Sequence, residues 1–502
     1  MLADAAWWIG QISECLAICE SLHRRYLEEG KVDRAALRAL DLGGMWMFRG
    51  EYSVASGWFS RGRRLLEGQP RGRGHALLAY MDGSEALAQE RLDDAVAAAR
   101  EMQEVSAGLD DDTFLALGLL LEGMVEIRRG RLREGFALAD EAMLPVLADR
   151  VEPDWVGNVY CTIMAVCYDL MDLPRAREWT RALERWLSGF ADAVMYLGVC
   201  RAHRLQLHAV EGAWAQAEME AAEVERDLAD MNLEAVAESA YQLGETYRIR
   251  GMHDRAAESF RLAAERGRDP QPGAALLQLA TGDADGACAA VTAAVSAAVP
   301  GPFACARLLR AQVEIGIASG HLGTAASAAS RLQAIRDRFR TPGFIAWADE
   351  AGGAVLLAEG RAADAVPLLS AAAGRLTQME APYDAARAAL LLSEALAATG
   401  DADAAQVHER AALDAFDRLG VPRPPGPRPT EPPPGGLTPR EAEVLVGIAT
   451  GASNRDVAAA LAISDATVRR HLANIYAKLG VGSRTAAAAW AHEHGMVAPS
   501  AG

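Results

Sequence analysis

Small and apolar positions recur along the first 420 residues with a period close to forty. A small residue, usually glycine, is followed five positions later by a small apolar residue inside an amphipathic segment, as in "GEYSVA" at Gly50. The markers are Gly10, Gly50, Glu90, Gly130, Met171, Gly212, Gly251, Gly282, Gly320, Gly360 and Gly400. Apart from one step of 31 residues, successive markers are 38 to 41 residues apart. This regularity indicates a tandem repeat.

Each repeat is predicted to be a helical hairpin. Glycine at the marker permits the turn between the two helices, and the small residue that follows lets them approach closely. One hairpin cannot bury its apolar face alone, so neighbouring hairpins should stack into an α-solenoid. We therefore predict an all-α fold of about ten such hairpins. The 31-residue step, around residues 266–275, contains two prolines and predicts a kink or a split into two stacks.

A proline-rich stretch separates the repeats from the rest of the chain. Residues 421–436, "VPRPPGPRPTEPPPGG", hold eight of the 21 prolines and should form a stiff, polyproline-like spacer. The predicted domains are residues 1–420, a repeat domain; 421–436, a linker; and 437–498, a compact C-terminal domain.

Four helix start signals fall within the C-terminal domain. The expected N-caps are Thr438, Ser453, Ser464 and Ser483, and the expected helix stops are Gly451, Gly480 and Gly495. In the third helix a buried stripe is predicted at Val468, Leu472, Ile475 and Leu479. The opposite face carries small alanines together with Arg469, Arg470 and Asn474. Such a face fits the DNA major groove, where arginine pairs with guanine and asparagine with adenine.

The segments "LTPREAEVL", "GASNRDVAAAL", "ISDATVRRHLANIYAKLGV" and "SRTAAAAWA" resemble the LuxR-type helix-turn-helix domain over its full length. The resemblance implies a four-helix domain whose third helix reads DNA bases. By position it assigns base reading to Arg469, Arg470 and Ala473, and the exposed helix face adds Asn474 as a further base-reading residue. The resemblance assigns phosphate contacts to Arg455, Ser464, Thr467, Lys478 and Arg484, and dimerisation to Trp490.

The repeats resemble the tetratricopeptide-type repeats of MalT-like regulators. Large members of that group carry an ATP-binding domain ahead of their repeats. A phosphate loop needs Gly-Lys followed by Ser or Thr, but Lys31 is followed by Val and Lys478 by Leu. We therefore expect no ATP-binding domain and no cofactor in this chain.

The charge is distributed unevenly. The whole chain has a formal net charge of −18. Residues 437–494 hold six basic and five acidic residues, a net charge of +1, which leaves −19 for the remainder. Phosphate electrostatics supply most non-specific DNA affinity, so an acidic repeat domain should suppress it. DNA binding should then depend on Arg469 and Arg470 and on dimerisation.

Other chemistry is sparse. The seven cysteines are scattered and form no CxxC motif, which favours a reducing compartment and therefore the cytoplasm. The histidines at 492 and 494 lack the spacing of a zinc-binding helix. We predict a transcriptional regulator and not an enzyme, without a metal or a membrane span. Its expected partners are double-stranded DNA, bound as a homodimer, and an unknown ligand or protein on the repeats. The alternative is an interaction scaffold whose DNA-binding head acts only within a larger complex.

Overall fold

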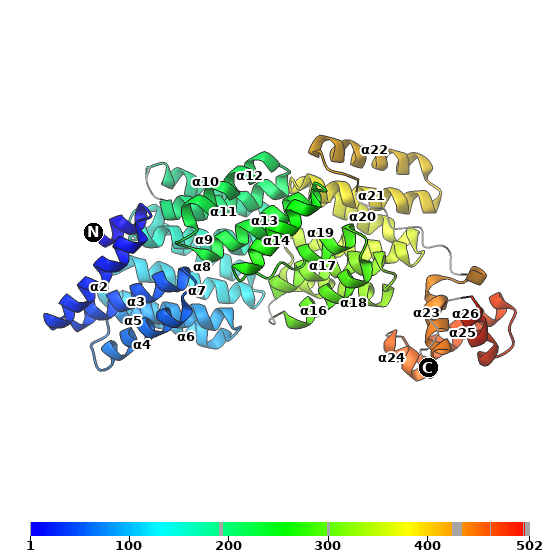
Figure 1. The fold of residues 1–502 in the computed structure, drawn as a ribbon, viewed down its shortest axis with the longest axis horizontal. Coiled ribbons are helices and arrows are strands. Elements are labelled where there is room, and N and C mark those ends of the chain that lie inside the picture. Colours follow the sequence, from blue (N-terminus) through cyan, green and yellow to red (C-terminus); the bar gives the residue numbers. More distant parts are fainter. Residues whose placement is uncertain are drawn as a thin grey trace.

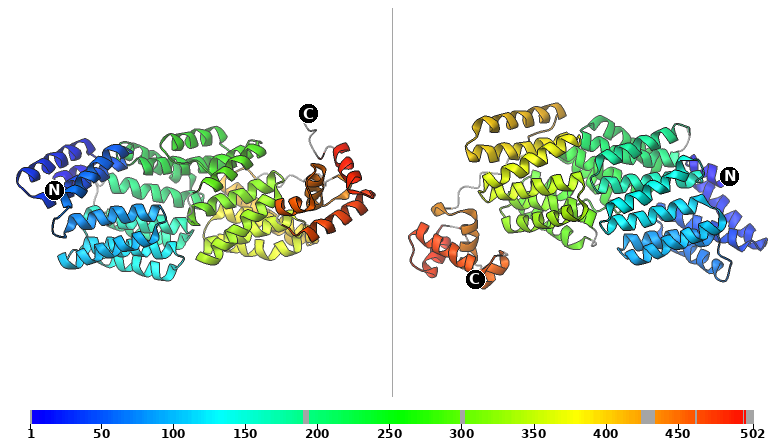
Figure 2. Two further views of the ribbon diagram at one scale, coloured as in Figure 1. Left: turned by 90° about the horizontal axis from the view of Figure 1, so that it is seen from below. Right: turned by 180° about the vertical axis from the view of Figure 1, so that it is seen from behind.

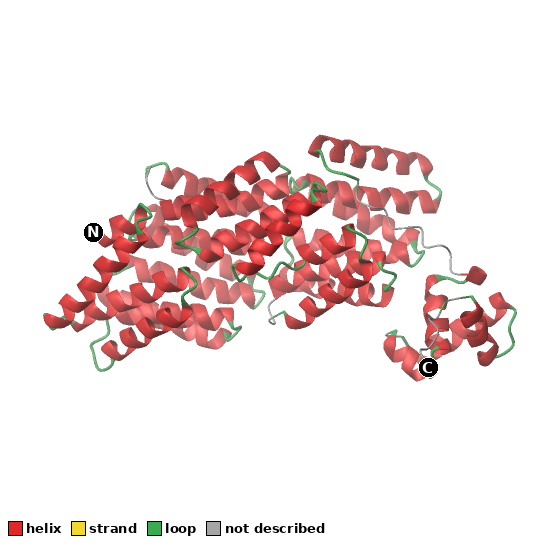
Figure 3. Ribbon diagram, in the orientation of Figure 1, coloured by secondary structure: helices red, strands yellow, loops and turns green. Residues whose placement is uncertain are grey.

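The computed structural model describes residues 2–189, 194–298, 302–423, 434–461, 463–494 and 496. These residues form twenty-six α-helices and one short 3-10 helix, with no strand among them (Figure 3). Within this described part of the chain, no helix combines the length and the apolar character needed to cross a bilayer. The predicted all-α fold class is confirmed.

Twenty-two helices pair into successive hairpins (Figure 1). The hairpins are α1 (Leu2–Trp8) with α2 (Ile12–Glu28), α3 (Val32–Phe48) with α4 (Tyr52–Leu66), α5 (Arg73–Ala88) with α6 (Leu92–Leu109), α7 (Asp112–Arg128) with α8 (Leu132–Leu147), α9 (Pro153–Asp169) with α10 (Leu173–Leu187), α11 (Val194–Glu211) with α12 (Trp214–Leu228), α13 (Leu233–Ile249) with α14 (His253–Glu265), α15 (Gly273–Ala280) with α16 (Ala284–Ala297), α17 (Pro302–Ala318) with α18 (Leu322–Phe339), α19 (Pro342–Ala358) with α20 (Ala362–Gln378), and α21 (Pro382–Thr399) with α22 (Ala402–Leu419).

Every marker of the sequence repeat lies in the turn between the two helices of a hairpin. All eleven have a positive φ, from 54° at Met171 to 98° at Gly282. Glycine reaches this region without a steric penalty, which explains its frequency there. The residues five positions after the markers are buried: Cys15, Ala55, Ala95, Gly135, Ala176, Ala217, Ala256, Ala287, Ala325, Ala365 and Ala405. The predicted helical hairpin is therefore confirmed.

The short repeat step marks a change in the stack. Helices α14 and α15 have only 13 and 8 residues. Figures 1 and 2 show α1–α14 and α16–α22 as two groups of helices that lie side by side. The second group contacts the α9–α10 turn, where Thr341 Oγ1 donates to the Leu170 carbonyl at 2.6 Å. It also contacts the start of α12, where Trp214 Nε1 donates to the Leu419 carbonyl at 2.7 Å. The predicted split coincides with this passage between the groups.

The C-terminal residues build a bundle with its own core. It consists of η1 (Pro434–Gly436), α23 (Pro439–Ala449), α24 (Asn454–Ala460), α25 (Asp465–Leu479) and α26 (Arg484–Glu493). Its buried side chains include Val444, Leu445, Ile448, Val457, Val468, Leu472 and Ile475. Most of the predicted linker and the expected helix stop at Gly495 lie outside the described residues. The division into domains at 420 and 436 stays a prediction.

Candidate nucleic-acid interface

Local sequence fixes both ends of α25. The Ser464 side chain accepts a hydrogen bond from the Thr467 N–H at 3.1 Å, as an N-cap does. Gly480 ends the helix with a φ of 67°, a left-handed conformation that glycine adopts without strain. Between these ends, Val468, Leu472 and Ile475 are buried in the bundle core. Leu479, the fourth predicted position, is half-buried against the same core, so three of the four predicted positions are fully buried.

The opposite face of α25 meets solvent. Arg469, Arg470, Ala473 and Asn474, the four predicted base-reading residues, are all exposed. Arg469 Nε donates to Asp465 Oδ2 at 2.9 Å, while 72% of its side chain stays exposed. Arg470 makes no hydrogen bond or ion pair with any described residue. Its guanidinium group is therefore available to an external acceptor.

Three of the predicted phosphate residues surround the start of α25 or lie on α24. Arg455 is exposed on α24 and has no ion-pair partner among the described residues. Ser464 is exposed at the N-cap, and its Oγ lies 2.8 Å from Thr467 Oγ1. Backbone N–H groups at a helix N-terminus attract anions. This end of the bundle therefore has the donors that a phosphate contact requires.

Lys478 has a partner inside the bundle. Its Nζ donates to Glu441 Oε2 at 2.6 Å, and Glu441, which is only 3% exposed, also accepts from the Thr438 N–H at 2.8 Å. Burial alone would raise the pKa of Glu441, but the hydrogen bonds from Lys478 and Thr438 hold that pKa below its ordinary value. The pair ties the end of α25 to the start of α23.

Arg484 is likewise engaged. Its Nη1 donates to Asn454 Oδ1 at 2.6 Å, and its Nη2 donates to the Ala452 carbonyl. These contacts join the start of α26 to the start of α24. Sequence reasoning missed this supporting role and that of Glu441. The signal for Glu441 is its position three residues after the N-cap Thr438, because a glutamate there returns a hydrogen bond to the cap and forms a capping box. The phosphate contacts assigned to Lys478 and Arg484 stay predictions.

Trp490, the predicted dimerisation residue, is half-buried against its own chain. Its ring stacks on His494 with centroids 3.9 Å apart. Gly435 of η1 lies so close that an added Cβ would sit 2.8 Å from Trp490 Cη2. One part of this indole therefore packs η1 onto the bundle. Its role between two chains stays a prediction.

Comparison with known proteins identifies the family of the C-terminal bundle. Residues 436–491 match the family described as "Bacterial regulatory proteins, luxR family". The bundle is a LuxR-type helix-turn-helix domain, and its relatives bear regulator names.

Two relatives illustrate the extent of the match. The uncharacterized transcriptional regulatory protein YhcZ of Bacillus subtilis (strain 168) is 50% identical over 60 residues, which cover 12% of this chain and 28% of that protein. The CsgBAC operon transcriptional regulatory protein of Escherichia coli (strain K12) is 45% identical over 58 residues, 12% of this chain and 27% of that protein. The chain thus spans about a quarter of the length of these curated relatives.

Two solved helical structures resemble the chain more broadly. A Rap protein complexed with competence and sporulation factor aligns with a TM-score of 0.49 and 12% identity, covering 68% of this chain and 98% of that one. The Cut9–Hcn1 hetero-tetramer structure aligns with a TM-score of 0.33 and 14% identity, covering 93% of this chain and 99% of that one. At these scores neither structure bears on function.

Proposed function

We propose that the chain is a cytoplasmic, sequence-specific DNA-binding regulator of transcription whose helix α25 enters the major groove. The observation that carries this proposal is the exposed face of α25, opposite the buried apolar stripe, where Arg470 has no hydrogen-bond or ion-pair partner among the described residues. Arginine binds the O6 and N7 acceptors of guanine bidentately, and such a pair contributes about 1–3 kcal/mol of discrimination. The match to a DNA-binding family supports the same assignment.

The remaining roles follow from the same docking. Arg469, Ala473 and Asn474 would meet neighbouring base edges. Backbone phosphates would be contacted by Arg455, Ser464, Thr467, Lys478 and Arg484. Pairing of two heads through α26 and Trp490 would give half-sites about one helical turn apart. The repeats of residues 1–420 would bind a ligand or protein that controls this pairing, and the protein would be a regulator and not an enzyme.

A direct test is selection of duplexes from a random library with the full chain, followed by fluorescence anisotropy titrations. We expect Arg470→Ala to cost about 1–3 kcal/mol at one base position of the selected site. Arg331→Ala is the matched control and should bind like the wild type, because this arginine of α18 is exposed and has no ion pair with any described residue. Failure to enrich any sequence, or an equal loss on selected and random duplexes, would contradict the proposal.

A second candidate is a scaffold whose head binds DNA only within a larger complex. It is favoured by the small net charge of +1 on residues 437–494 and by the internal contacts of Lys478 and Arg484. Both features reduce the cationic surface available for phosphates. This reading predicts that the purified chain retards no duplex in a mobility-shift assay, and that retardation returns when cell extract supplies the partner.

A further inference from the structure

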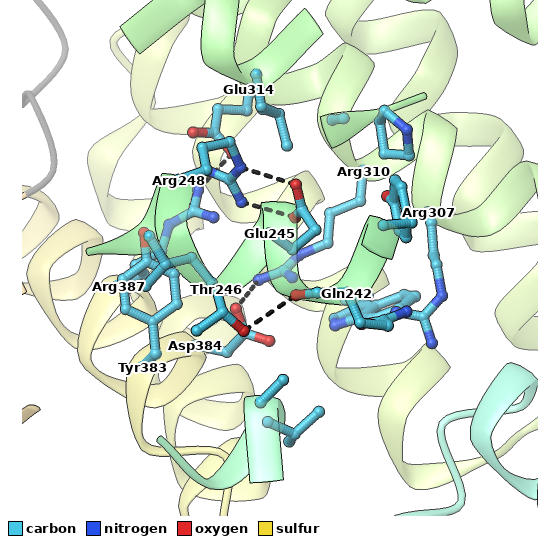
Figure 4. Close-up of a pocket in the computed structure, with 18 of the residues that line it drawn as sticks. Gln242, Glu245, Thr246, Arg248, Arg307, Arg310, Glu314, Tyr383, Asp384 and Arg387 are labelled. Atoms are coloured by element: carbon cyan, nitrogen blue, oxygen red, sulfur yellow. Dashed lines mark hydrogen bonds and ion pairs between the residues drawn. The ribbon is translucent and has the colours of Figure 1, made fainter. Parts of the chain in front are cut away.

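A cavity of about 130 Å³ lies inside the solenoid where both groups of helices converge (Figure 4). The first group supplies Tyr168 of α9 and a run of α13 from residue 241 to 249. The second group supplies residues of α17, α19 and α21. A cavity of about 150 Å³ holds one benzene molecule, so this cavity suits a ligand of similar size.

Charged side chains line this cavity to an unusual degree. Three ion pairs are Arg248–Glu245 at 2.8 Å, Arg310–Asp384 at 2.9 Å and Arg387–Glu314 at 2.7 Å (Figure 4). Burial alone would raise the pKa of Asp384 and of Glu314, but the facing arginines hold both values below the ordinary range. Asp384 and Glu314 are therefore ionised. Arg310 also pairs at 2.8 Å with Glu350, which lies just behind the lining, so these three arginines are fully matched by carboxylates.

Arg307 is the fourth arginine in the lining, and no carboxylate of the described residues lies within ion-pair distance of it. Its guanidinium carbon lies 4.4 Å from the ring centre of Tyr168 and 5.4 Å from that of Trp347. Its Nη2 donates to the Tyr168 carbonyl at 3.3 Å. Asp169 and Glu238 act on it only through space. The Arg307 guanidinium therefore keeps donors that no carboxylate of the described residues occupies.

Trp347 is a second lining residue with a polar group that lacks a partner among the described residues. This residue is 2% exposed, and its indole N–H has no acceptor among the described residues. A buried donor without an acceptor, like a buried charge without a counter-ion, costs free energy that a complementary ligand offsets. The ring faces of Trp347 and Tyr168 also offer apolar area beside the Arg307 charge.

We propose that this cavity binds a small monocarboxylate of about benzene size, with its carboxylate on Arg307 and its apolar part against Trp347 and Tyr168. Arg307 is the one lining arginine without a carboxylate at ion-pair distance among the described residues, so the site accommodates one carboxylate, and the planar guanidinium binds it bidentately. Because the walls come from both helix groups, the ligand holds those groups together. Under the proposed function, a ligand of the repeats regulates DNA binding, and this site would name the chemical class of that ligand. Only the effect of the ligand on DNA binding rests on the proposed function.

The test is isothermal titration calorimetry of the full chain with acetate, isobutyrate and benzoate. Benzamide serves as the neutral counterpart of benzoate, and inorganic phosphate as the competing anion. We expect at least one carboxylate to bind, benzamide to bind at least about tenfold more weakly than benzoate, and phosphate to bind more weakly than the carboxylate. No binding of any acid to the wild type, equal binding of benzamide, or tighter binding of phosphate overturns the proposal.

Variants locate the site. Arg307→Gln should weaken carboxylate binding at least about tenfold, and the control Arg331→Gln should leave it unchanged. Circular dichroism and melting verify folding. If Arg307→Gln does not fold, Arg307→Lys is the alternative variant. Lysine keeps the positive charge but loses the two parallel N–H donors of the guanidinium, so carboxylate binding should weaken several-fold. Wild-type affinity in both Arg307 variants overturns the assignment.

The outcomes for site and function are separable. Calorimetry is performed without DNA, and DNA affinity is measured on the selected duplex with and without saturating benzoate. Carboxylate binding by a chain that binds no specific duplex keeps the site and removes the proposed function. Specific DNA binding by a chain that binds no carboxylate removes the site alone. If both occur but DNA affinity changes less than about threefold, the regulatory consequence is wrong.

Discussion

Arg310 of the solenoid and Arg470 of the C-terminal bundle are used in opposite ways. In the solenoid, Arg310 contacts both Glu350 and Asp384 at 2.8 and 2.9 Å, with 18% of its side chain exposed. In the bundle, Arg470 and Arg455 are exposed and have no ion-pair partner among the described residues. Arg310 is thus neutralised inside the solenoid, whereas Arg470 and Arg455 face solvent at the bundle.

This difference explains how an acidic chain keeps a usable basic face. Internal ion pairs neutralise arginines in the part of the chain that carries a net charge of −19. A buried pair adds little net stability, but removal of one partner leaves the other charge buried and costs several kcal/mol. An exposed and unpaired arginine costs little to keep and remains available to an anion. The same substitution should therefore affect stability in one region and binding in the other.

The largest effect is expected from Arg310→Ala. Removal of this guanidinium leaves Glu350, which is 4% exposed, and Asp384 without their cation. We expect the free energy of unfolding to fall by about 3–5 kcal/mol. Urea denaturation of the full chain, followed by circular dichroism, measures this loss. Arg331→Ala should stay within about 0.5 kcal/mol of the wild type.

The pH dependence of stability is a second measurement on the Arg310→Ala variant. With Arg310 present, the pKa of Asp384 lies below its ordinary value of 3.8, so the folded state gains stability that is lost only as the pH falls through that lowered pKa. Without Arg310, the effect of burial on Asp384 loses its largest opposing interaction, so the pKa of Asp384 should rise. The deficit of Arg310→Ala should therefore be largest near pH 7 and shrink toward pH 4. A deficit that does not change with pH would show that lost packing, and not charge, is its cause.

A smaller loss is expected from Glu441→Ala in the bundle. The substitution removes the acceptor for both the Thr438 N–H and the Lys478 ammonium, and we expect local stability to fall by about 2 kcal/mol. Hydrogen exchange of α23 and α25 in the full chain measures it, with the exposed Glu493→Ala as control. Since the folded pKa of Glu441 is below 4.5, its contribution is present at neutral pH and is lost as the pH falls through that pKa. Unchanged exchange would contradict a supporting role for the pair.

Arg455→Ala should alter binding without altering stability. A phosphate contact contributes equally to every sequence, so affinity should fall alike on selected and random duplexes. The slope of log affinity against log salt should decrease by about one. Anisotropy titrations at several salt concentrations measure the slope, and Arg331→Ala is again the control. A loss confined to the selected duplex would instead place Arg455 at a base edge.

The sequence predicted those features that depend on residues close together in the chain. Each hairpin turn depends on a few neighbouring residues, so markers such as Gly50 and Gly360 are enough to predict where the turns lie. The exposed face of α25 follows from helical periodicity, and the positions of Arg470 and Val468 agree with it. The assigned contacts with DNA depend on a partner that periodicity does not describe, so they stay predictions.

Long-range pairing was not predictable. Lys478 and Glu441 are 37 residues apart, and Arg310 and Asp384 are 74 apart. Which charged residue meets which depends on how the helices stack after each one has formed. Many exposed glutamates and arginines satisfy the same local pattern, so the sequence offers no basis for choosing among them. The cavity around Arg307 was missed for this reason, because its walls come from helices of both groups.

The smallest expected effect comes from Asp465→Asn, which tests whether Arg469 is intermediate between the two uses of arginine. Arg469 is exposed, yet Asp465 accepts its Nε–H at 2.9 Å, so DNA binding must exchange this contact for one with DNA. An exposed pair one helical turn apart is weak, and the substitution also removes a negative charge from the approaching face. We expect affinity for selected and random duplexes to rise about twofold to threefold at low salt, with the gain vanishing at high salt. Asp403→Asn, at the first turn of α22 in the solenoid, is the matched control, and a fall in affinity for Asp465→Asn would show that Asp465 positions Arg469 for binding instead of competing for it.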